Sequence, residues 1–404
     1  MKRTFSFLVR QSFRVGILLT LFIAPTQWSL EPRPKFHLSL ADVTLAFTAG
    51  VWFLDAVLRR EWRRLRPPPC VQVLFVAVAG LSFFAAADKA LAVKDIVQLI
   101  EFFIVGHILF AAFLREHQGA LWQALTVLFV ATAINVGVAV WQYFSDAGVM
   151  GVCGTFGNRN VLGGYLAIAL PLAFGVLLGA RQVWVKAAMG ALLITGALVN
   201  LSGASYFIVG GVLACMAARR GHKVFIPVAA CLLLAQIDVL PNLPRGNDIA
   251  HFKSVAVYDE EGQVEKRYPE WQAAYDMTLN HPWLGVGMGN YQKQVGQYFG
   301  NFSRPTGPTE PDIQNLYLVL AGSAGFPVVL LFIVLLSGAI RSARSAAAHG
   351  TGLNAGLGIG AGGAILAFAL TAVWHPLLVR GIGLPLVFVL ALAQTLATGE
   401  KRHE

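Results

Sequence analysis

Charged residues are scarce in this sequence. Lys, Arg, Asp and Glu make up 13% of its 404 residues, whereas a soluble globular domain carries about 25%. Hydrophobic residues make up 56%, and apolar runs of about 20 residues, the length that an α-helix needs to cross a bilayer, recur along the chain. A soluble fold is therefore excluded, and we expect an all-α, polytopic transmembrane helix bundle.

The apolar runs predict about twelve membrane spans. The seventh and eighth spans are the weakest of these predictions because both runs are short. The runs cover residues 13–30, 37–58, 71–87, 92–114, 121–143, 160–180, 187–203, 204–218, 224–240, 314–340, 353–376 and 379–398.

Three further absences narrow the class of protein. The sequence has only four cysteines, which suggest no disulfide framework. Its first 30 residues have a basic start and an apolar core but no small-residue cleavage site, so they predict a first span rather than a cleavable signal peptide. The two halves of the chain show no similarity, which counts against a twelve-span transporter built from repeats. Such a transporter is the least favoured alternative.

The distribution of positive charge predicts the topology. The chain has 31 Lys and Arg against 21 Asp and Glu, a net charge of +10. With a cytoplasmic N-terminus and alternating spans, the short basic loops all fall inside, as the positive-inside rule requires. We therefore expect nine spans in residues 1–240, a large outer loop at 241–312, and three spans followed by a cytoplasmic tail in residues 313–404.

The outer loop is the one long hydrophilic stretch between spans, which predicts recognition or chemistry there. Within it, Pro269 favours a helix start, and the helix should end near His281. Arg267 would then lie just before a helix N-terminus, where backbone N–H groups favour an anion, and its guanidinium can grip two phosphate oxygens. Pairing of Arg267 with a nearby glutamate on the surface is an equally good interpretation.

Two other outer helix starts carry polar residues. Arg159 stands between Asn158 and Asn160 where the sixth span begins, and Asn315 follows Gln314 at the start of the tenth. If the bundle brings these ends together with Arg267, two arginines and several amides face one region suited to a pyrophosphate. Simple helix capping explains each asparagine equally well when it is taken alone.

Other polar residues carry weaker signals. The glycines of residues 285–289 lack the spacing of a dinucleotide-binding loop and predict a flexible turn that lets backbone approach a ligand. His281 and His375 each precede a proline with no His or Cys cluster around them, so structural roles are favoured over acid–base chemistry or metal binding. Lys94 and Asp95 stand near the outer end of the fourth span, where ionisable groups are costly and usually functional, although they could pair or reach the interface.

Three segments, in this order, resemble the O-antigen ligase and polymerase family of bacterial inner membranes. They are Gly154-Thr-Phe-Gly-Asn-Arg-Asn-Val-Leu-Gly-Gly164 at the head of a span, Arg267-Tyr-Pro-Glu-Trp271 followed by residues 281–291 in the outer loop, and Gln314-Asn-Leu-Tyr-Leu318 leading into residues 322–326. The likeness covers roughly residues 90–340.

The resemblance implies a metal-independent glycosyltransferase that needs no cofactor. Such enzymes take a glycan from undecaprenyl pyrophosphate on the periplasmic side and pass it to an acceptor hydroxyl. The acceptor is lipid A core in ligases, which we favour, and a second lipid-linked glycan in polymerases. Arginines hold the pyrophosphate and offset its charge as the glycosidic bond breaks. Membrane lipids surround such a protein, and no nucleic acid is expected as a partner.

Two positions depart from the family pattern. Gln314 stands where the family usually has a histidine, and residues 201–206 lack the arginine of a Ser-Arg-Gly motif. A glutamine can orient a hydroxyl but cannot accept a proton, and a general base contributes about 10²- to 10⁴-fold to the rate. A non-catalytic relative that binds lipid-linked glycan is therefore the main alternative to an enzyme.

Other residues of the chain are candidates to fill these two gaps. Arg159 and Arg380 could supply the missing positive charge, and Glu270, Asp276 or His281 could replace the base. We therefore expect Arg267, Gln314 and Arg159 as catalytic residues, and Asn158, Asn160, Lys94, Asn315, Tyr317, His281 and Arg380 as substrate-binding residues.

Overall fold

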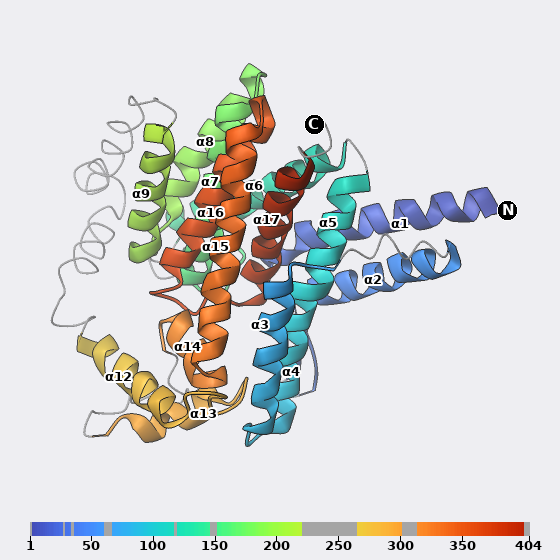
Figure 1. Ribbon diagram of the computed structural model, residues 1–404. Helices are drawn as coiled ribbons and strands as arrows, with labels where there is room; N and C mark the ends of the chain where they lie inside the picture. Colours follow the sequence, from blue (N-terminus) through green and yellow to red (C-terminus); the bar gives the residue numbers. More distant parts are fainter. Residues whose placement is uncertain are drawn as a thin grey trace, which may run out of the picture.

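A computed structural model describes residues 2–26, 29–33, 36–59, 67–116, 119–145, 152–219, 265–300 and 313–399. Helices dominate these residues (Figure 1), which confirms the all-α class. The longer ones are α1 (Lys2–Ile23), α2 (Leu40–Arg59), α3 (Cys70–Leu81), α4 (Lys89–Ile100), α5 (His107–Glu116), α6 (Ala120–Phe144), α7 (Arg159–Gly179), α8 (Val183–Val199), α9 (Gly203–Arg219), α12 (Glu265–Asn280), α13 (Tyr291–Val295), α14 (Leu316–Ala324), α15 (Phe326–His349), α16 (Gly352–Thr371) and α17 (Arg380–Gly399).

Helix length and composition identify a polytopic membrane protein. In the described part of the chain, seven helices are long and apolar enough to cross a membrane, and three shorter apolar helices accompany them. One of the seven joins α4 and α5 through a π-helical turn at Glu101–Gly106. The expected span at 224–240 and most of the expected outer loop lie outside the described residues. The count of twelve spans and the domain limits at 240 and 312 therefore stay predictions.

The N-terminal helices α1 and α2 form a pair beside the bundle. Helices α1 and α2 run side by side and cross the direction of the central helices in Figure 1. The hydroxyl of Thr20 donates to that of Thr44 over 3.1 Å between the two helices. A short antiparallel hairpin of β1 (Ser29–Arg33) and β2 (Phe36–Ser39) connects them.

The expected span at 314–340 is not one helix, and this prediction was wrong. It breaks at Gly325, whose φ of 86° is open to glycine but strained for other residues. A side chain there would collide with the backbone of Trp283. The N–H of Phe326 also donates to Pro282 O over 2.9 Å. The loop after α12 thus presses against the break, so that only α14, nine residues long, leads into the span α15.

The centre of the bundle is the close contact between α7 and α16. A methyl group on Gly175 of α7 would lie 2.7 Å from the Cα atom of Gly360, and one on Gly179 would lie 2.7 Å from Gly352 O. Small residues let helix backbones approach in membranes, where van der Waals packing replaces the hydrophobic effect. The two helices run antiparallel, so the start of α7 lies beside the end of α16.

Substitution at this contact should destabilise the bundle. We expect Gly175→Ala to lower the free energy of unfolding by about 1–3 kcal/mol, because the added methyl overpacks a rigid backbone contact. Gly190→Ala on α8 is the matched control, since its methyl would meet no described atom within 4 Å, and alanine favours the helix by about 0.5–1 kcal/mol. Thermal unfolding in detergent measures both, and equal midpoints for the two variants would contradict the packing argument.

Candidate active site

His375 lies at the centre of a buried polar cluster between α16 and α17. Its side chain is 3% exposed. Nδ1 lies 3.2 Å from Oε1 of Gln314, and Nε2 lies 3.2 Å from Oγ of Ser202. Because an amide oxygen only accepts hydrogen bonds, Nδ1 carries the proton in this arrangement. Nε2 then carries the lone pair, which accepts a hydrogen bond from the Ser202 hydroxyl.

Gln314 reaches this position through the cap of α14. The side chain of Asn315 accepts hydrogen bonds from the N–H groups of Tyr317 and Leu318, over 2.9 and 3.1 Å. The N–H of Leu316 donates to Ala372 O at the end of α16, over 2.8 Å. These bonds fix the start of α14 against the end of α16, and the preceding residue therefore faces the imidazole. Capping is thus the role that the structure assigns to Asn315.

Ser202 comes from the break between α8 and α9. The hydroxyl of Ser205 donates to Gly163 O on α7 over 2.7 Å. A methyl group on Gly163 would lie 2.6 Å from the Cβ atom of Ser202, so the break packs directly on the backbone of α7. This stretch, which lacks the expected arginine, supplies a hydroxyl to His375 instead.

Arg159 and Arg267 act on the same imidazole. Burial, followed by the positive charges of Arg267 and Arg159, lowers the pKa of His375 to about 3. The guanidinium of Arg267 also lies over the ring of Trp374, 5.5 Å from its centroid. Burial lowers the pKa of Arg267, and the charge of Glu270 opposes that shift. Two guanidinium groups, from α7 and α12, thus lie close enough to the imidazole to oppose its protonation.

The helix that carries Arg267 differs from the prediction at one end. It ends at Asn280 as expected, but it begins at Glu265 and contains Pro269 in its interior. Arg267 therefore lies in the first turn of α12 and not ahead of it. The ring of Trp271, one turn further on, lies 5.8 Å from that of Trp374 and fastens α12 to the segment that carries His375.

The remaining expected site residues are spread around this cluster. Asn158 caps α7, with its side chain accepting from the N–H of Asn160 over 2.7 Å. The hydroxyl of Tyr317 donates to Ala369 O on α16 over 2.8 Å. His281 is exposed and contacts the Tyr298 hydroxyl, 3.2 Å away. Arg380 begins α17, and its side chain lies outside the described structure, whereas Lys94 lines a separate cavity on α4.

The glycine-rich turn at 285–289 packs closely against the backbone of other segments. Its three glycines have positive φ values of 60°, 97° and 71°. A methyl group on Gly289 would lie 2.6 Å from Leu91 O, and the N–H of Val286 donates to Gly322 O over 2.8 Å. The glycines therefore let the loop pack tightly against α4 and α14, while Met288 and Gly289 also line a cavity beside α4, so the expectation that the turn approaches a ligand stays a prediction.

Comparison with known families agrees with the segments noted in the sequence. Residues 151–333 match the family model described as O-antigen ligase. This match supports a relationship of the chain to the O-antigen ligase family. No curated protein matches the chain. The matched stretch contains Arg159, Ser202, Arg267 and Gln314, whereas His375 lies 42 residues beyond its end.

His375 is the residue of this cluster that the sequence does not predict as part of the site. No neighbouring His or Cys marks it, and its partners come from positions 61 and 173 residues away. The one available signal is its place after an apolar span, on the same side of the membrane as Arg159. This position indicates a functional role for His375 only together with the knowledge that Gln314 lies beside it.

The buried imidazole should make stability depend on pH. An unfolded histidine has a pKa near 6.5, and that of His375 in the folded protein is about 3. Above about pH 6.5 the neutral His375 therefore makes its full contribution to the free energy of unfolding. As the pH falls toward 3, the unfolded chain takes up a proton that the folded protein does not, and the free energy of unfolding decreases by up to about 1.4 kcal/mol per pH unit. Unfolding midpoints in detergent measured from neutral to acidic pH should fall less steeply in His375→Gln than in wild type.

The exposed His281 supplies the matched control for this measurement. His281→Gln also replaces a histidine by glutamine, but at an exposed position outside the cluster. Parallel pH profiles for wild type and His375→Gln would contradict a neutral, buried His375.

Proposed function

We propose that the protein is an O-antigen ligase of the bacterial inner membrane. It transfers a glycan from undecaprenyl pyrophosphate to a hydroxyl of lipid A core on the periplasmic side. The observation that carries this proposal is the meeting of Arg159, Arg267 and the neutral His375 at one end of the bundle, within or next to an O-antigen ligase domain. This arrangement has positive charge for a leaving group and a lone pair for an attacking hydroxyl.

The two arginines suit the pyrophosphate of the donor. Two guanidinium groups beside a buried imidazole repel one another, and an anion between them relieves the repulsion. Each guanidinium can grip two phosphate oxygens. Positive groups already in place where negative charge develops are usually the largest contribution to such a reaction. In this proposal the arginines neutralise the leaving group and no metal takes part.

His375 is the proton acceptor in this scheme. The acceptor hydroxyl gives its proton to Nε2 while its oxygen bonds to the anomeric carbon of the glycan. The bond from that carbon to the pyrophosphate breaks, and its electron pair stays on the pyrophosphate oxygen beside Arg159 and Arg267. Gln314 holds the Nδ1–H tautomer, and the bound pyrophosphate offsets the charge that keeps the imidazole from taking up a proton. Base strength is therefore linked to donor binding.

The distribution of charge supports a periplasmic site. Apart from Arg159, the basic residues on α15 and in the α7–α8 connection and first turn of α8 lie toward the ends of the helices that point away from the cluster. The exposed side chains there are Arg181, Lys186, Arg341 and Arg344. Basic residues favour the cytoplasmic side, so the end that holds His375 is assigned to the periplasm, with both termini in the cytoplasm.

His375 also favours an enzyme over a non-catalytic relative. The family histidine is absent at 314, but an imidazole lies 3.2 Å from the amide that replaces it. The site keeps a proton acceptor at the same place, supplied from a different helix end. The description of the matching family as O-antigen ligase favours lipid A core as the acceptor over a second lipid-linked glycan.

Removal of one guanidinium tests the donor site. We expect Arg267→Ala to reduce transfer at least about 10²-fold, because one group that stabilises the leaving charge is lost. Arg267→Lys should retain only part of the activity, since an ammonium does not bind two oxygens in a plane. Mass spectrometry of products from undecaprenyl-pyrophosphate oligosaccharide and lipid A core measures the rate. Arg344→Ala, exposed at the far end of α15, is the control, and a fully active Arg267→Ala enzyme would refute the assignment.

Loss of the imidazole tests the base. We expect His375→Gln to slow transfer by about 10²- to 10⁴-fold while undecaprenyl pyrophosphate still binds. Gln314→Ala should slow transfer less, because it removes the group that orients the imidazole and leaves the imidazole itself. Single-turnover rates with bound donor separate the chemical step from binding. Unchanged rates in His375→Gln would mean that the acceptor is activated elsewhere.

A further inference from the structure

The cavity beside α4 adjoins the segments that carry His375 and Gln314. It has a volume of about 610 Å³ and is enclosed by α4, by the loop into α13, by α14 and by residues 376–379. Pro376, which follows His375 directly, and Leu316, two residues after Gln314, are part of its wall. The residues of the arginine–histidine cluster do not line it. The cavity and the cluster therefore share the two segments that position the imidazole.

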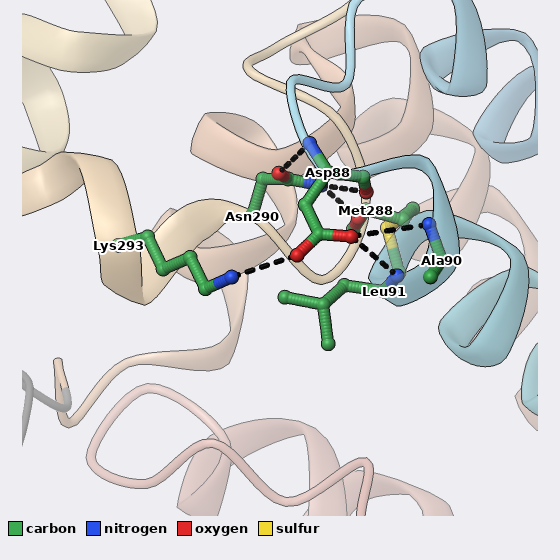
Figure 2. A network of polar contacts seen from close by, with 6 residues as sticks. All are labelled: Asp88, Ala90, Leu91, Met288, Asn290 and Lys293. Carbon is green, nitrogen blue, oxygen red and sulfur yellow. Dashed lines mark hydrogen bonds and ion pairs between the residues drawn. The ribbon is translucent and has the colours of Figure 1, made fainter. Parts of the chain in front are cut away.

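A network of polar contacts connects α4 to the loop before α13, and these two segments form walls of the cavity (Figure 2). The carboxylate of Asp88, at the cap of α4, accepts from Nζ of Lys293 over 2.8 Å. The N–H of Asp88 donates to Oδ1 of Asn290 over 2.7 Å, and Nδ2 of Asn290 donates back to Asp88 O over 3.0 Å. Asn290 is 1% exposed. Helix α4 and the loop into α13, about 200 residues apart in sequence, are thus held in a fixed relation.

The lining of the cavity is polar on one side and apolar on the other. Helix α14 and residues 376–379 contribute mainly aliphatic side chains, whereas α4 and α13 contribute charged and amide groups. The polar residues of these two helices are Lys94, Asp95, Gln98, Gln292 and Lys293. A cavity with this division suits a molecule that has both an apolar chain and a polar, charged head.

Lys94 is the residue that indicates the charge of the head. Its side chain is half-buried on the cavity wall. Among the residues that the structure describes, it has no hydrogen-bond or ion-pair partner, in contrast to Lys293, which is paired with Asp88. An ammonium withdrawn from water is costly unless an anion meets it. A half-buried ammonium on the wall of the cavity therefore favours an anionic group in the molecule that the cavity binds.

We infer that this cavity is the acceptor subsite and binds a lipid-anchored sugar that carries a phosphate, with Lys94 on the phosphate. The inference rests on the proposed function, because transfer between two lipid-linked molecules needs two sites that meet at the reacting atoms. The arginine pair occupies the donor side. The cavity offers the second site, next to the segments that hold the proton acceptor, from which the sugar hydroxyl reaches the anomeric carbon.

Binding measured without turnover tests the subsite. The probes are phosphorylated lipid A core and the same glycolipid after removal of its phosphates, each titrated into the purified full-length protein in detergent. Wild type should bind the phosphorylated form more tightly by about ten- to a hundredfold, the range of one charge-assisted contact. Lys94→Ala should bind both forms equally, and Lys94→Arg should restore the preference. Binding of undecaprenyl pyrophosphate should be the same in all three proteins.

Kinetics supply an independent readout. In Lys94→Ala the KM for lipid A core should rise about tenfold or more, with kcat and the KM for the donor nearly unchanged. Lys186→Ala removes an exposed lysine on α8 and is the charge-matched control. Unchanged unfolding midpoints in both variants show that the comparison concerns folded protein. A fall in kcat, or an equal loss for donor and acceptor, would overturn the assignment to the acceptor.

The failures of the two proposals can be told apart. Transfer that proceeds with acceptor binding independent of Lys94 overturns the subsite alone. Glycolipid binding that depends on Lys94, in a wild-type protein that transfers nothing, overturns the proposed reaction. Phosphatidylglycerol micelles and inorganic phosphate serve as competitors: displacement of the glycolipid by either at equal phosphate concentration would show a general phosphate or lipid-headgroup site and overturn the acceptor assignment.

Discussion

The close contact between α7 and α16 is the constraint on which the site depends. Glycines at 175, 179, 356 and 360 let the two backbones touch, which fixes the start of α7 beside the end of α16. Arg159 stands at that start, and His375 lies four residues after that end. Their spacing is set by the packed helices and by the short turn that follows α16. A site that binds a charged, transferable group gains from such a frame, because misplacement of about 1 Å can cost much of the rate.

The second constraint is electrostatic. Arg159 and Arg267 both lower the pKa of an imidazole that is 3% exposed, and burial lowers it most. Without donor, the imidazole stays neutral and accepts protons poorly. With a pyrophosphate between the arginines, its affinity for a proton rises at the moment when an acceptor hydroxyl must lose one. In the proposed reaction the same charges would thus bind the leaving group and restrict the base to the donor-bound state, a coupling that needs no moving part.

Much of this architecture could be predicted from the sequence, and the limits have physical causes. Apolar runs of the right length identified most of the helices, since lipid forces the backbone to bond within each segment. They did not reveal the break at Gly325, because hydropathy does not record the loop backbone that presses on that residue. Arg159, Arg267 and Gln314 were chosen from local motifs and do lie around one imidazole. His375 was set aside because its partners come from α8–α9 and from α14, contacts that only the folded chain brings together.

Positions 314 and 375 lie next to each other for a simple geometric reason. A histidine at the start of α14 and one in the segment between α16 and α17 approach the same point from two sides, because Leu316 is hydrogen-bonded to Ala372. Side chains from the two positions therefore meet, and Gln314 supplies an acceptor for Nδ1 of His375 here. The requirement of the site is an oriented lone pair at one place in space. The helix end that supplies it can change while the chemistry remains the same.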